Sequence, residues 1–99
     1  MKYKIKVVKK PPIVIAAEIV YVIIDGKQKL HSALACPCGC NSVILLNLLK
    51  DSDTHWKLRK SKTGLATLSP SIWRTSGCKS HFFIRKGNVV WVRENYDFD

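Results

Sequence analysis

Acidic residues are scarce in this 99-residue sequence, because 7 Asp and Glu stand against 17 Lys and Arg, which gives a formal net charge of +10. A charge this large for the length indicates an acidic partner, such as nucleic acid, an anionic surface or an acidic protein. The simpler interpretation is solubility, since the basic residues are scattered from Lys2 to Arg93. No arginine-rich helix and no aromatic platform for bases stands out, so nucleic acid is the less favoured partner.

The sequence also lacks a long apolar run. The longest, over residues 13–24, is interrupted by Glu18 and is too short to span a bilayer. Residues 1–6 alternate charged with apolar side chains and contain no apolar segment of a secretory signal. We therefore expect a cytoplasmic protein without a membrane partner, whose thiols stay reduced.

Repeats and low-complexity segments are absent too, and the hydrophobic content of 46% argues against disorder. The length predicts one domain over residues 1–99, with a modest core that a bound metal would stabilise. An acidic tail over 95–99 follows the last predicted strand. The length alone leaves the oligomeric state open.

Short runs of β-branched and alternating apolar residues predict a mainly β fold. Residues 3–8, 27–34, 56–59 and 65–68 are each typical of one strand. Residues 13–24 fit one long strand or two short ones, and residues 42–49 favour a strand with a short helix as the alternative. Pro70 predicts a bend or a bulged edge. The expected fold is a small antiparallel β domain around a zinc knuckle, with one short helix at most.

Two turn signals predict hairpins in this fold. Asp25-Gly26 favours a hairpin between the second and third predicted strands. Gly87-Asn88 separates strands over 80–86 and 89–94, which sets Ile84 opposite Trp91 and Phe82 opposite Arg93. Along the first of these strands, Ser80 and His81 are neighbours and therefore point to opposite faces.

Three of the four cysteines, Cys36, Cys38 and Cys40, lie within five residues of one another, and Cys78 lies far downstream. Thiolates this dense repel one another unless a cation holds them, and zinc takes four sulfur or nitrogen donors. The first three are too close to pair easily with one another, so a metal site is favoured over disulfides.

Two ligand sets are open for this metal. The four thiolates of Cys36, Cys38, Cys40 and Cys78 would form a closed, structural zinc site. Alternatively, three of these cysteines combine with His81, which follows Cys78 at a C-x2-H spacing. An iron–sulfur site is less favoured, because a Rieske centre needs two histidines. We prefer the tetrathiolate set, since it leaves His81 available for another role.

Serines surround His81 in residues 69–81. A serine becomes a nucleophile only beside a base that takes its proton. Ser80 is poorly placed, because it is the strand neighbour of His81, whereas Ser71 on the proline-bent segment could reach the imidazole. The alternative is that these serines cap turns and the histidine is structural.

The ordered motifs Cys-Pro-Cys-Gly-Cys at 36–40, Leu-Ser-Pro-Ser-Ile at 68–72, Gly-Cys-Lys-Ser-His-Phe-Phe-Ile at 77–84 and Gly-Asn-Val-Val-Trp at 87–91, with Trp56, resemble one small bacterial family. Its members are encoded in operons with ubiquitin-like proteins and their E1-like and E2-like partners. The resemblance covers about residues 30–92. It implies a serine peptidase that processes the C-terminus of the ubiquitin-like protein or removes it from targets, and a place in antiphage defence.

Carried over by residue, the resemblance implies zinc on the four cysteines, Ser71 as nucleophile, His81 as general base and Ser80 as the second candidate nucleophile. Asn41 departs from the glycine usual after the third cysteine, which questions the exit turn. Asp51, Asp53 and His55 are candidates for a third catalytic group. Two other functions remain open: a non-catalytic zinc-binding adaptor of the same pathway, and a zinc-dependent nucleic-acid-binding module.

Overall fold

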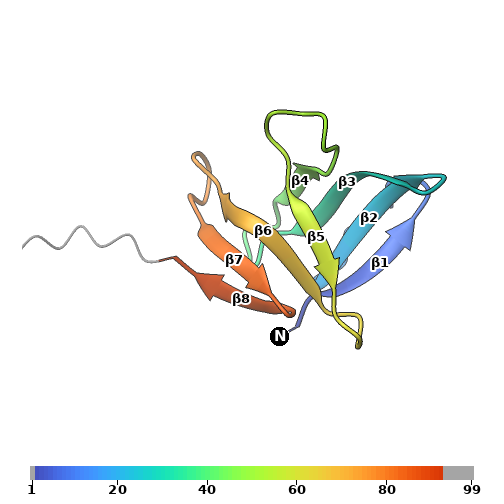
Figure 1. The fold of residues 1–99 in the computed structure, drawn as a ribbon. Coiled ribbons are helices and arrows are strands. Elements are labelled where there is room, and N and C mark those ends of the chain that lie inside the picture. The colour runs from blue at the N-terminus through green and yellow to red at the C-terminus, as the bar shows by residue number, and fades with distance from the viewer. Residues whose placement is uncertain (1, 93–99) are drawn as a thin grey trace, which may run out of the picture.

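The computed structural model describes residues 2–92, and this part of the chain forms eight strands and no helix (Figure 1). The first sheet has the order β1 (Lys4–Val8), β2 (Ile19–Asp25), β3 (Gln28–Ala35) and β4 (Val43–Asn47). The second has the order β5 (Lys57–Lys60), β6 (Ala66–Trp73), β7 (His81–Arg85) and β8 (Asn88–Trp91). The mainly β class is confirmed, and residues 42–49 contain a strand rather than the alternative helix. The tail expected over 95–99 lies outside the described residues.

The first sheet departs from the expected antiparallel arrangement at its edge, where β1 and β2 are parallel. Residues 9–18 form the crossover between them, and Pro11 and Pro12 within it cannot continue a ladder. Ile15 of this crossover packs against Tyr21 and Ile23 on the outer face of the sheet. The strand expected from residue 13 therefore begins only at Ile19, because β-branched composition does not distinguish a packed crossover from a strand.

The two sheets face each other across a shared core. Their inward side chains alternate along the strands, as the period of a strand requires. The buried residues include Val20, Leu34, Ile44 and Leu46 from the first sheet and Leu68, Ile72, Phe82 and Ile84 from the second. Strand β2 is buried on both faces, which accounts for its unbroken apolar sequence.

Tyr3 ties the two sheets together at one corner. Its N–H donates to the Gly87 carbonyl at 2.8 Å, and its own carbonyl accepts from the Ala66 N–H at 3.1 Å. The Tyr3 hydroxyl donates to the Ala35 carbonyl at 2.8 Å, and burial raises the pKa of Tyr3 to about 12. This side chain therefore connects the second sheet to the residue that precedes Cys36.

The β7–β8 hairpin turns at Lys86-Gly87, one residue earlier than expected. Ile84 pairs with Val89 and Phe82 with Trp91, so both predicted pairings are wrong by two residues. Lys86 and Gly87 both have positive φ, 48° and 81°, as a type I′ turn requires. A shift of two residues keeps the same side chains on each face, so Phe82 and Ile84 still point into the core.

No helix that could span a membrane occurs in residues 2–92.

Candidate active site

The four cysteines converge between the two sheets. Cys36 directly follows β3, Cys38 and Cys40 lie in the turn before β4, and Cys78 lies in the β6–β7 connection. Their Sγ atoms all lie within 4.8 Å of one another. Cys36 Sγ is 3.4 Å from Cys38 Sγ and 3.7 Å from Cys78 Sγ, and all four are free thiols. A tetrahedral zinc with bonds of about 2.3 Å has sulfur–sulfur edges of about 3.8 Å, so this cluster could hold a metal ion.

The knuckle turn depends on two residues with left-handed backbone conformation. Gly39 has a φ of +89° and Asn41 a φ of +65°. Cys36 N–H donates to the Ser42 carbonyl at 2.9 Å, and Gly39 N–H donates to the Cys36 carbonyl at 3.3 Å. Asparagine tolerates this conformation better than most residues. Asn41 therefore fits the exit turn of the knuckle, although related sequences usually have glycine at this position.

Neighbouring side chains set the acidity of the cysteines. The Ser80 hydroxyl, 3.2 Å from Cys78 Sγ, and then the Ser80 N–H lower the pKa of Cys78 to about 6. Burial raises the pKa of Cys36 to about 11. Arg74 Nη1 lies 3.8 Å from Cys40 Sγ and from Cys78 Sγ, where its positive charge favours thiolates. A bound metal would have to displace the proton of Cys36.

Ser71 and His81 meet on the outer face of the second sheet, where Ser71 Oγ lies 2.8 Å from His81 Nε2. Residues 69–71 of β6 stand opposite the single residue Phe83, because the register shifts between Leu68 and Ile72. Such a bulge re-aims side chains on a strand. It turns Ser71 toward His81, which pairs with Trp73 two positions further along β6.

Two tryptophans hold this pair in place. The Trp73 indole stacks on the His81 ring with centroids 5.1 Å apart and planes 15° apart. Trp56 Nε1 donates to the Ser71 carbonyl at 3.3 Å. The imidazole and the serine backbone are thus each fixed by an aromatic side chain.

Ser80 occupies the opposite face, as expected from its position next to His81. Its side chain is buried, and Oγ lies 3.8 Å from Cys36 Sγ in addition to its contact with Cys78. His55 Nδ1 lies 3.0 Å from the Ser52 carbonyl within the β4–β5 connection. The structure therefore brings Ser71 to His81 and Ser80 to the cysteines.

Sequence reasoning missed the contacts of Trp73 and Arg74. A signal existed for Trp73, because Ser71 and Trp73 occupy alternate positions of one strand and so share a face. For Arg74 there was none, since its contact with Cys40 spans 34 residues.

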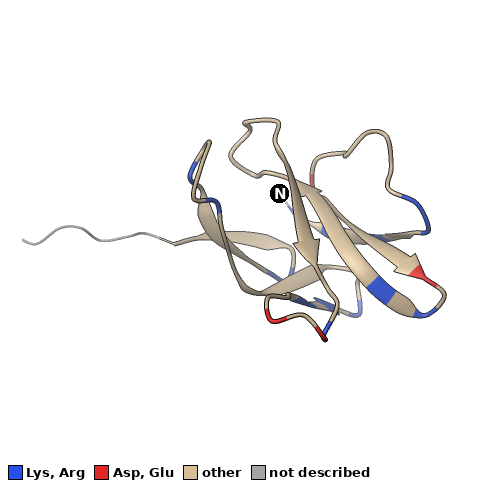
Figure 2. Ribbon diagram, turned by 90° about the horizontal axis from the view of Figure 1, so that it is seen from above, with Lys and Arg blue, Asp and Glu red and all other residues tan. Residues whose placement is uncertain are grey.

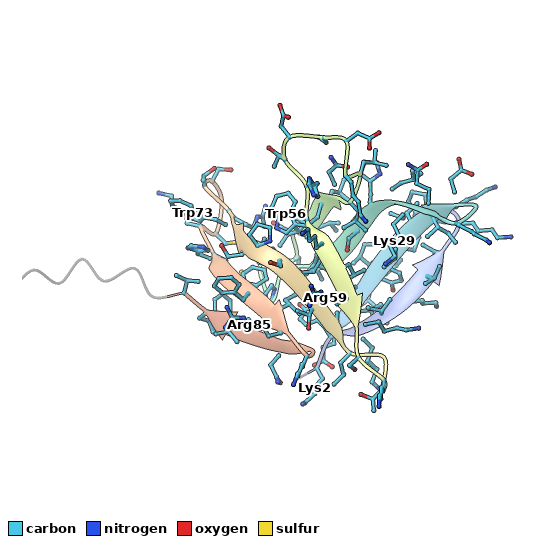
Figure 3. The ribbon with its side chains drawn as sticks, in the orientation of Figure 1. Lys2, Lys29, Trp56, Arg59, Trp73 and Arg85 are labelled. Carbon is cyan, nitrogen blue, oxygen red and sulfur yellow. The ribbon has the colours of Figure 1, made fainter. Side chains whose placement is uncertain are left out.

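Three hollows are lined by residues of β6, and one of them is also lined by His81. One of about 510 Å³ reaches the imidazole between Trp73 and Trp91. The second, of about 280 Å³, lies between β4 and the end of β6 and is bordered by Trp56 and Trp73. The third, of about 630 Å³, crosses the outer face of the second sheet between β5 and β7. Figure 3 labels Trp73 at the end of β6, Arg59 on β5 and Arg85 on β7.

Comparison with known protein families gives a match over most of the chain. The family described as bacterial ubiquitination-like system serine protease (BubE) matches residues 7–92, which extends the similarity upstream of the motif region. No curated protein and no solved structure matches the chain significantly. Since the match covers most of the 99 residues, this chain belongs to the BubE family of bacterial ubiquitination-like system serine proteases.

Proposed function

We propose that this chain is a serine peptidase that processes or deconjugates a bacterial ubiquitin-like protein at its C-terminus. The observation that carries the proposal is the 2.8 Å contact between Ser71 Oγ and His81 Nε2 on an open sheet face. A serine beside an oriented imidazole is the minimum that nucleophilic acyl transfer requires. The family description supports the reaction class and the pathway.

The reaction follows from this pair. His81 Nε2 accepts the Ser71 proton as Oγ attacks the scissile carbonyl, and a tetrahedral intermediate forms. The intermediate collapses to an acyl-enzyme on Ser71, while His81 gives the proton to the departing amine. Water then attacks the ester as His81 again accepts a proton, which returns to Ser71 Oγ when the new carboxyl group leaves. The Trp73 stack keeps the imidazole in the required orientation throughout.

The metal in this proposal is a structural zinc on Cys36, Cys38, Cys40 and Cys78. Four thiolates complete a tetrahedral sphere and leave no position for a reactive water. His81 is not needed as a ligand, and its Nε2 faces Ser71. When bound, zinc would join the knuckle before β4 to the segment that leads into β7. Its contribution is to hold His81 in place.

The substrate tail fits the groove beside β4, which is an edge strand. Cys36 N–H donates to the Ser42 carbonyl and Leu48 N–H donates to the Leu30 carbonyl. The backbone N–H and C=O groups of the even-numbered residues of β4 therefore point toward β3. The backbone groups of Val43 and Leu45 therefore point to the open edge. An extended peptide can pair with such an edge, and here it would lie toward Trp73.

The partners in this proposal are the ubiquitin-like protein and the E1-like and E2-like proteins of its pathway, acting with this chain as one domain in the cytoplasm. The net charge of +10 favours an acidic partner and speeds its encounter. Figure 2 shows the basic residues spread over the ribbon.

The test is the intact mass of the pathway's ubiquitin-like protein, carrying a C-terminal extension, after incubation with the parent and with Ser71→Ala, Ser80→Ala and His81→Ala. We expect cleavage by the parent, none by Ser71→Ala or His81→Ala, and residual cleavage by Ser80→Ala. The zinc content and the thermal unfolding of each variant are measured as controls. Values equal to those of the parent would show that a loss of cleavage is chemical rather than structural.

Two results would contradict the proposal. Binding of the ubiquitin-like protein without cleavage by a folded, zinc-loaded parent would identify an adaptor. Loss of zinc from His81→Ala would identify His81 as a metal ligand.

A further inference from the structure

The groove on the outer face of the second sheet ends at Ser69, two residues before Ser71 on β6. Its floor is formed by Thr67, Leu68 and Ser69 of β6, the strand that carries Ser71. Ser69 is separated from Ser71 by Pro70 alone, and two residues of extended chain span at most about 7 Å, so the groove ends close to the nucleophile. A peptide chain passing Ser71 can continue along this floor.

The walls of the groove are basic on both sides. Lys57 and Arg59 border it from β5, and Arg85 and Lys86 border it from the end of β7. Residues 54–92 contain eight Lys or Arg and no Asp or Glu, so this whole sheet has no acidic side chain of its own. The described acidic residues lie elsewhere: Glu18, Asp25, Asp51 and Asp53. The four cations of this groove have no acidic side chain in their own sheet to pair with. The groove can therefore bind anionic groups of another molecule.

The aromatic side chain of the groove argues for a peptide rather than for nucleic acid. Single strands bind by stacking their bases on exposed aromatic rings. Phe83 is the aromatic residue that lines this groove, and the Arg85 guanidinium already lies over its ring at 4.3 Å from the centroid. Arg85 thus covers a face of the Phe83 ring on which a base could stack, while its charge stays in the groove. This arrangement favours a peptide with carboxylates over a nucleic-acid strand.

We propose that this groove binds an acidic, extended segment of the substrate on one side of the scissile bond. The proposal rests on the peptidase function above and assigns the substrate chemistry of the same site. The groove beside β4 takes the chain on the other side of the bond, since the two grooves lie on either side of Ser71 along β6. Carboxylates at alternate positions share one face of an extended peptide and can reach the basic walls together.

The binding experiment uses the Ser71→Ala protein and two labelled peptides of about ten residues, one with Glu at alternate positions and one with Gln there. Fluorescence anisotropy should show affinity about tenfold higher for the Glu peptide, falling with added salt. Arg59→Gln with Arg85→Gln should bring this ratio close to one. Lys4→Gln with Lys6→Gln on β1 removes the same charge from the other sheet and should leave it unchanged.

A cleavage experiment separates this proposal from the peptidase function. The parent is given the ubiquitin-like protein with a Glu-bearing or a Gln-bearing extension, and initial rates are compared. Preference for the Glu extension, lost in Arg59→Gln with Arg85→Gln, supports the groove. Cleavage of both at equal rates overturns the groove alone, whereas selective peptide binding without any cleavage overturns the peptidase alone.

Two further binding results would overturn the assignment. An equal loss in the β1 control pair would show that only net charge matters. Tighter binding of a single-stranded oligonucleotide than of the Glu peptide, with the same dependence on Arg59 and Arg85, would make this a nucleic-acid groove.

Discussion

Ser80 Oγ lies 3.2 Å from Cys78 Sγ, so the residue before His81 is hydrogen-bonded to a sulfur of the cysteine cluster. Ser80 is also linked to Arg74, whose backbone N–H donates to the Ser80 carbonyl at 2.8 Å. The start of β7 is thereby held between the cluster and the end of β6. A metal on the cysteines and the position of the imidazole are coupled through one buried serine.

Removing the metal should therefore lower both the stability of the fold and the activity. We expect Cys78→Ser, or treatment of the parent with a strong chelator, to lower the melting temperature by about 10 °C or more, because structural zinc contributes folding free energy. Elemental analysis should find one zinc per parent chain and a loss in Cys78→Ser. An unchanged melting temperature after complete chelation would contradict this role.

Ser80→Ala should weaken the link without removing the metal. The variant loses hydrogen bonds between its hydroxyl and two sulfurs, so we expect unfolding free energy to fall by about 1 kcal/mol. Zinc should remain, and cleavage should continue at a reduced rate. Complete loss of cleavage in a folded, zinc-loaded Ser80→Ala protein, with Ser71→Ala active, would instead make Ser80 the nucleophile.

Trp73 is predicted to position the imidazole. Trp73→Ala should lower kcat about tenfold, because an aromatic stack contributes about 0.5–1.5 kcal/mol. Trp73→Phe should restore most of this loss, since a ring remains over His81. The indole is largely exposed, so neither variant should change the melting temperature much. A change in KM alone would assign Trp73 to substrate binding rather than to positioning.

The open edge of β4 can be tested with Leu45→Pro. Proline is tolerated at a strand edge whose N–H faces outward, so the fold should survive while the donor for an added strand is lost. We expect KM for the ubiquitin-like substrate to rise several-fold, by about 1 kcal/mol for one hydrogen bond. Leu45→Ala keeps the N–H and serves as the control for the lost side chain. Equal KM values in the two variants would exclude pairing at this residue.

Gly87 is predicted to be essential to the junction of the two sheets. A Cβ there would lie 3.0 Å from Leu65 Cδ2 and 3.1 Å from the Tyr3 carbonyl oxygen, and φ is +81°. Gly87→Ala should lower unfolding free energy by about 2–3 kcal/mol. Gly26→Ala, at φ +60° with nothing within 4 Å of the added Cβ, should lose only about 1 kcal/mol. Denaturant unfolding compares them, and equal losses would show that backbone strain alone decides.

The local patterns of the sequence determined the mainly β class, the close spacing of Cys36, Cys38 and Cys40, and the face on which each β7 side chain lies. Alternation places Phe82 and Ile84 inside and His81 outside whatever the partner strand, because the period of a strand is a local property. It could not place residues 13–18, whose apolar side chains fit a strand and a packed crossover equally well. Nor could it choose between turns at Gly87-Asn88 and Lys86-Gly87, since the close approach of Tyr3 to Gly87 joins distant segments.

In the candidate site, too, some features follow from the sequence and others only from the tertiary structure. The spacing of the cysteines and the exclusion of Ser80 from the face of His81 follow from the sequence, because thiolate repulsion and strand alternation act over a few residues. Only the tertiary structure brings Ser71 to 2.8 Å from His81, stacks Trp73 on the imidazole and places Arg74 beside the sulfurs. These contacts depend on a bulge and on pairing between strands, and such long-range register is decided by the whole core rather than by any one segment.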